Sequence, residues 1–64
     1  PMNTETLKQT LDWIETLAED QNLTTEHKEV ASVLARRKLD NDPDLLPKTL
    51  ARTAIDNARD HLHD

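Results

Sequence analysis

The C-terminal quarter of the chain, residues 47–62, carries the most regular pattern in the sequence. On a helical wheel its apolar side chains fall in one arc, and its charged and polar side chains fall outside that arc. The apolar set consists of Leu50, Ala51, Ala54, Ile55, Ala58 and Leu62. This pattern is typical of a surface helix that packs one stripe against a partner. Half of the stripe is alanine, so we expect a neighbouring helix to approach its backbone closely.

The composition of the whole chain also favours helices. Glycine is absent, which removes the positive-φ positions that tight hairpins and glycine-rich phosphate loops need. Leu is the most frequent residue, the good helix formers Leu, Ala, Glu, Lys and Arg together make up 29 of the 64 residues, and Trp13 is the only aromatic residue. Cysteine is absent, so the sequence predicts neither disulfides nor thiolate metal sites. No apolar run approaches the roughly 20 residues of a membrane span, and we expect a cytoplasmic protein without a membrane partner.

Two further helices are predicted upstream of residue 47. Asn3 or Thr4 suits the N-cap of the first, and Asn22 suits the left-handed position after its last turn. Thr24 or Thr25 suits the N-cap of the second. The sequence therefore predicts an all-α fold, a small three-helix bundle and a single domain over residues 1–64, with helices at about 4–21, 25–40 and 47–62.

The predicted helices carry apolar stripes of different quality. In the first helix the central stripe consists of Leu7, Leu11, Ile14 and Ala18. In the second helix the expected stripe consists of Val30, Ala31, Val33 and Leu34. We also expect Leu45 and Leu46, which lie between two prolines, to cover one end of the core.

The apolar content is small for a chain of 64 residues. Chains of this size often complete their cores by oligomerising. We therefore expect a homodimer whose seam includes Leu11, Trp13, Ile14 and Leu17. Pro1 precedes Met2, and we expect it to be a remnant of cloning or proteolysis.

Catalysis and metal binding find little support in the sequence. The only serine, Ser32, lies five residues after His27, and this spacing on a helix does not place a nucleophile beside a base. The terminal cluster of Asp60, His61, His63 and Asp64 offers too few ordered ligands for a structural metal site. We expect no enzyme, no cofactor and no metal.

The charge of the chain is concentrated in its first half. The formal net charge is −5, and residues 1–29 hold seven acids and two bases, whereas residues 30–64 hold six of each. This balance favours a protein partner with a basic surface over general nucleic-acid affinity. Glu5, Asp12 and Glu19 repeat along one face of the first helix, either as a solubilising face or as a binding face.

Trp13 lies at the edge of the apolar arc of the first helix, where it can be either a core residue or an interface anchor. Our leading hypothesis is a non-catalytic, small acidic protein-interaction module of the kind that phage or bacterial genomes encode. It would act as a regulator or inhibitor by binding a partner protein. The predicted partner-binding residues are Asp12, Trp13, Glu15, Leu17 and Glu19.

The alternative hypothesis is a nucleic-acid-linked function. The chain could bind nucleic acid directly, or the acidic face of the first helix could imitate a phosphate backbone and block a nucleic-acid-binding protein. The residues predicted for direct binding are Arg36, Arg37, Lys38, Lys48, Arg52 and Arg59.

Overall fold

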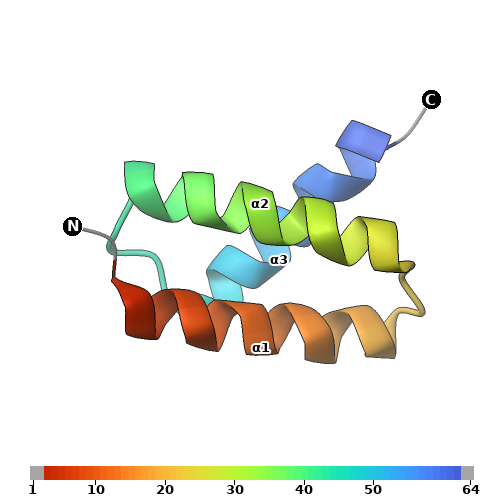
Figure 1. Cartoon of the computed structure of the whole chain (residues 1–64), viewed down its shortest axis with the longest axis horizontal. Coiled ribbons are helices and arrows are strands. Elements are labelled where there is room, and N and C mark those ends of the chain that lie inside the picture. Colours follow the sequence, from red (N-terminus) through yellow and green to blue (C-terminus); the bar gives the residue numbers. More distant parts are fainter. Residues whose placement is uncertain (1–2, 63–64) are drawn as a thin grey trace.

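The computed structural model describes residues 3–62 as a bundle of three helices (Figure 1). The helices are α1 (Thr4–Asp20), α2 (Thr25–Asn41) and α3 (Pro47–Leu62). They account for 83% of the described residues, none of which lies in a strand. In Figure 1, α1 and α2 run antiparallel beside each other, and α3 crosses them diagonally. The predicted all-α three-helix bundle is confirmed, and the expected helix limits are correct to within one residue.

The first two helices begin at side-chain caps. The side chain of Asn3 accepts a hydrogen bond from the backbone N–H of Thr6 at 3.1 Å. Thr24 Oγ1 accepts one from the backbone N–H of His27 at 3.2 Å. Each cap satisfies a donor that has no partner inside the helix, so the start of each helix is encoded locally.

The end of α1 is a left-handed turn at Asn22, whose φ is 56°. The N–H of Leu23 donates to the carbonyl of Ala18 at 2.9 Å, and the N–H of Asn22 donates to the carbonyl of Glu19 at 3.3 Å. These two bonds form a Schellman motif, which satisfies carbonyls at the end of the helix. The predicted role of Asn22 is confirmed.

The connection from α2 to α3 is a tight turn at Pro43. The N–H of Leu45 donates to the carbonyl of Asp42 at 3.4 Å. Pro47 is the first residue of α3, a position where the missing N–H of proline costs nothing. The carbonyl of Leu46 accepts the first helical bond from the N–H of Leu50 at 2.9 Å.

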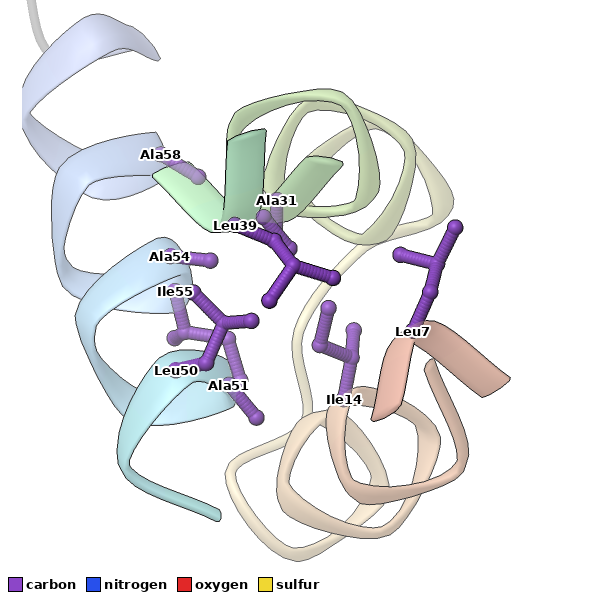
Figure 2. Packing of buried hydrophobic residues seen from close by; sticks show 10 residues of the cluster. Leu7, Ile14, Ala31, Leu39, Leu50, Ala51, Ala54, Ile55 and Ala58 are labelled. Carbon is purple, nitrogen blue, oxygen red and sulfur yellow. The ribbon is translucent and has the colours of Figure 1, made fainter. Parts of the chain in front are cut away.

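The core lies between the three helices, and α3 contributes more of its residues than either α1 or α2 does (Figure 2). The predicted alanine-rich stripe of α3 is correct, since five of its six residues are buried and Leu62 is half-buried. Each helix contacts both of the others. The buried apolar residues are Leu7, Ile14, Ala18, Ala31, Ala35, Leu39, Leu50, Ala51, Ala54, Ile55 and Ala58.

The residues of α2 that face the core differ from the expected ones. The buried residues of α2 are Ala31, Ala35 and Leu39, whereas Val33 is 52% exposed. Small residues at the centre of the contact let α2 approach the alanines of α3, and the larger Val30 and Leu34 pack at its margins. Our expectation that Val33 belongs to the core was wrong.

Two further side chains depart from the expected core. Leu45 packs against the core, but Leu46 is 71% exposed and does not cover its end. Thr10 is fully buried, and its hydroxyl donates to the carbonyl of Thr6 at 2.7 Å. This bond back to the preceding turn explains why a polar residue is tolerated there.

None of the helices within residues 3–62 combines the length and the apolar character needed to span a membrane. The expectations about Pro1, and about His63 and Asp64 as ligands, concern positions outside the described residues.

Candidate partner-binding surface

Trp13 lies at the surface of α1 with 36% of its area exposed. It borders an open hollow whose other lining residues are Gln9, Asp12 and Thr16. The indole therefore presents apolar area to solvent beside a carboxylate. Trp13 is neither a fully enclosed core residue nor a fully exposed one.

A second hollow adjoins the first along α1, because both include Thr16. Leu17 supplies apolar surface to it, and Glu19 and Asp20 supply carboxylates. We call the combined surface the Trp13 face. Its residues are Gln9, Asp12, Trp13, Thr16, Leu17, Glu19, Asp20 and Asn22.

The helical period of α1 assembles the Trp13 face. Gln9 precedes Trp13 by four residues and Thr16 follows it by three, so the three side chains lie on neighbouring turns of one side. Asp20 continues the row four residues after Thr16. Gln9, Thr16 and Asp20 are absent from the residues predicted from the sequence, although the i ± 3 and i ± 4 neighbours of Trp13 identify Gln9 and Thr16, and a further step of four residues identifies Asp20.

One side chain from α3 also contributes to this surface. Lys48 Nζ lies 5.0 Å from the centroid of the Trp13 ring, a cation–π geometry. Lys48 stands in the second position of α3, so this contact ties the start of α3 to the middle of α1. We had assigned Lys48 to the alternative nucleic-acid set and not to the surroundings of Trp13.

Glu15 lies apart from the Trp13 face. Its Oε1 is 3.6 Å from Lys28 Nζ on α2, whereas Trp13 is in contact with α3. Glu15 and Trp13 therefore lie on different flanks of α1. Of the five predicted partner-binding residues, the structure brings together the four others, namely Asp12, Trp13, Leu17 and Glu19.

The residues expected to form a dimer seam on α1 are largely used inside the single chain. Ile14 is only 1% exposed, and Leu11 and Leu17 pack against the core as partly buried residues. Only Trp13 among the four presents a large exposed surface. Of the four expected seam residues, Ile14 is therefore enclosed by the single chain, whereas Trp13 and, in part, Leu11 and Leu17 remain accessible.

The six bases of the alternative set are divided between two parts of the bundle. Arg36 and Arg37 border a hollow built entirely from α2 residues. Lys48 reaches Trp13, and Arg59 donates a hydrogen bond to the side chain of Gln21 just after α1. Arg52 is exposed and follows Lys48 by four residues, so it continues the side of α3 that borders α1.

The only serine is not placed for nucleophilic catalysis. Ser32 Oγ donates to the carbonyl of Lys28 at 2.8 Å, and His27 Nδ1 lies 2.9 Å from Thr24 Oγ1. Both side chains are thus engaged locally and not with each other. Among residues 3–62, no group of three histidine or carboxylate side chains comes together in a way that could hold a metal ion.

Comparison with known proteins returned no match to this chain among protein-family models, curated proteins or solved structures.

Proposed function

We propose that this chain is a non-catalytic interaction module that regulates or inhibits a partner protein by binding it through the Trp13 face. The observation that carries the proposal is the exposed indole of Trp13 beside the carboxylates of one side of α1. A tryptophan with about a third of its area exposed in an open hollow is the kind of anchor that dominates binding energy in protein interfaces.

The charges around Trp13 indicate the chemistry of the partner. Asp12, Glu19 and Asp20 are all exposed, and no ion pair engages them within residues 3–62. Carboxylates at the margin of an apolar anchor attract a basic surface and accelerate its association. The proposed partner is therefore a protein with lysines or arginines around an apolar pocket that accepts the indole.

The test starts from the full chain, immobilised and used to capture binding proteins from lysates of its source cells. Association and dissociation rates of the purified partner are then measured by surface plasmon resonance. Trp13→Ala should raise the dissociation rate by roughly tenfold or more, because truncating a central anchor typically costs above about 1–2 kcal/mol. The double variant Asp12→Lys/Glu19→Lys should mainly lower the association rate, most strongly at low salt.

A matched control separates a specific face from total charge. Asp56→Lys/Asp60→Lys makes the same change in net charge on the exposed side of α3. It should leave the association rate closer to that of the unmodified chain. If Trp13→Ala and Asp12→Lys/Glu19→Lys both bind the partner normally, the Trp13 face is not the working surface.

A nucleic-acid-linked function is the second candidate, and one observation favours it. Lys48, Arg52 and Arg59 follow one side of α3 next to the exposed Trp13, an arrangement in which cations and an aromatic ring meet. Direct binding predicts a salt-dependent shift in the anisotropy of labelled single-stranded DNA or RNA. The double variant Arg52→Glu/Arg59→Glu should abolish that shift.

Imitation of a phosphate backbone by the acids of α1 makes a different prediction. In that case nucleic acid should compete with the chain for the captured partner, while the chain itself binds no nucleic acid. A partner that is captured equally well in the presence and absence of excess DNA would exclude this form of the second candidate.

A further inference from the structure

The outward face of α2 carries an apolar residue that the fold does not use. Val33 is 52% exposed in the middle of the helix, and Val30, one turn earlier, packs against the edge of the core but stays partly exposed. An isolated exposed valine needs no explanation. Here, however, an ordered set of charges surrounds it. We call this surface the α2 face, which consists of Glu26, Glu29, Val30, Val33, Arg36 and Arg37.

The charges of the α2 face are separated along the helix. Glu26 and Glu29 precede the two valines, whereas Arg36 and Arg37 follow them. All four charged side chains are exposed. Within residues 3–62 the only ion pair joins Lys28 to Glu15, so none of the four is engaged in one.

The spacing of this face is symmetric about its centre. Glu26, Val30, Val33 and Arg37 follow one another at intervals of four, three and four residues, which keeps them on one side of a helix. Reversing the direction of the helix exchanges Glu26 with Arg37 and Val30 with Val33. The face is therefore complementary to a copy of itself in the antiparallel orientation.

We propose that a second copy of this chain packs on the α2 face, with the two α2 helices antiparallel and related by a two-fold axis. Val30 of each copy lies against Val33 of the other. Glu26 of each copy meets Arg37 of the other, so the pair forms twice, as the symmetry of an isologous interface requires. Glu29 and Arg36 lie beside the same seam, and Glu29 of each copy lies near Arg36 of the other.

The hollow on α2 fits this arrangement. It lies beside Val33 and is lined also by Ser32, Arg36, Arg37 and Asp40. In the antiparallel register it receives the N-terminal half of the second α2, whose glutamates reach the two arginines. Asp40 is an exposed carboxylate one turn beyond the two arginines, and in this register it lies level with Leu23 of the second copy, outside the Glu26–Arg37 pairs.

The charges also select the orientation and the occupant. A parallel pair would place glutamates against glutamates and arginines against arginines, which is unfavourable. A partner of one charge sign would pair with only the glutamates or only the arginines of the α2 face. A second copy satisfies both halves, and it does so despite the net charge of −5 on each chain.

This assembly is independent of the proposed function. The α2 face lies on α2, whereas the Trp13 face is built from α1 and the start of α3. A dimer formed through α2 thus leaves two Trp13 faces available. Failure of the dimer would not remove the binding function, and the variants that test the two surfaces are different.

The first experiment measures molar mass against concentration by sedimentation equilibrium. The full chain should move from 7.3 kDa toward twice that mass as its concentration rises. Val33→Glu should stay monomeric, and because glutamate is a good helix former the fold should persist. The matched control is Leu46→Glu, which adds the same charge at an exposed leucine outside the α2 face and should still dimerise.

Charge exchange tests the pairing itself. Arg37→Glu places two carboxylates opposite each other at both ends of the seam, and it should weaken dimerisation by about tenfold or more. The double variant Glu26→Arg/Arg37→Glu restores opposite charges and should recover most of the lost affinity. Recovery of this kind would not occur if the two residues never met.

Cross-linking tests the orientation, and the chain contains no native cysteine to interfere. An equimolar mixture of Glu26→Cys and Arg37→Cys should form the mixed disulfide in preference to either symmetric one. In the antiparallel register, two copies of residue 26 lie about 16 Å apart along the helices. A chain that stays monomeric at all accessible concentrations would overturn the proposal. So would a Val33→Glu variant that dimerises while Trp13→Ala does not.

Discussion

Asn22 ends α1 because it accepts a left-handed backbone that most residues resist. The two hydrogen bonds that follow, from Leu23 to Ala18 and from Asn22 to Glu19, depend on this conformation. In a chain without glycine, asparagine is the residue best suited to the position. The turn between α1 and α2 is thus decided by one side chain.

Replacing Asn22 should change stability in opposite directions according to the new residue. Asn22→Gly should raise the free energy of unfolding by up to about 0.5–1 kcal/mol, since glycine carries no left-handed penalty. Asn22→Ala should lower it by about 1 kcal/mol. Urea denaturation followed by circular dichroism measures both. The control Asn57→Gly, in the exposed middle of α3, should instead destabilise by about 0.3–0.5 kcal/mol.

Lys48 from α3 lies over the ring of Trp13 on α1. Lys48→Gln should lower stability by about 0.5–1 kcal/mol, because it removes an exposed cation–π contact. It should also shift the fluorescence of Trp13 to longer wavelength, since the ring gains contact with water. Trp13 is the only tryptophan, so the emission reports on this site alone. Lys38→Gln is the control, and an equal shift there would refute the assignment.

At the scale of the helices, alanine determines how α2 and α3 meet. Ala31 and Ala35 on α2, and Ala51, Ala54 and Ala58 on α3, are all at most 2% exposed. Side chains this small let two helix backbones come close, and they leave the larger residues of α2 at the margins of the contact. The exposure of Val33 follows from this packing.

Enlarging an alanine in this contact should separate the helices. Ala54→Leu should lower the free energy of unfolding by about 1–3 kcal/mol, the usual cost of overpacking a dense core. The same substitution at the exposed Asn57→Leu should have an effect within about 0.5 kcal/mol. Thermal denaturation of the two variants side by side provides the comparison. If Ala54→Leu is neutral, the helices are not in close contact at this point.

At the scale of the whole molecule, one chain already encloses its core. Ile14, Leu39, Leu50 and Ile55 are each at most 2% exposed without any second copy. The sequence predicts a dimer with a seam on α1 that includes Ile14, but Ile14 is already buried inside the single chain. Dimerisation through the α2 face, in contrast, joins two chains that are already folded.

Dissociation should therefore leave the fold intact. The monomeric Val33→Glu variant should keep the far-ultraviolet circular dichroism of a predominantly helical protein and should unfold cooperatively. The melting temperature of the unmodified chain should rise with concentration by mass action, whereas that of the variant should not. Loss of helical signal in the variant under conditions where Leu46→Glu keeps it would show that folding depends on dimerisation.

The sequence by itself determined the helices and their ends, because these depend on periodicity and cap chemistry within a few neighbouring residues. The stripe of α3, the turn at Asn22 and the two N-caps belong to this class, although the sequence left each cap open between two neighbours, Asn3 or Thr4 and Thr24 or Thr25. Part of the Trp13 face was also accessible, since the positions around Trp13 on one helix follow from helical spacing.

Only the tertiary structure decided which flank of each helix meets which neighbour. The apolar arc of α2 is wide enough to place either Val33 or Ala35 inward, and the close approach of α3 selected Ala35. The same choice set Lys48 against Trp13 and Glu15 against Lys28, contacts that join residues far apart in the chain. Such pairings depend on how three helices share one core, and no local pattern contains that information.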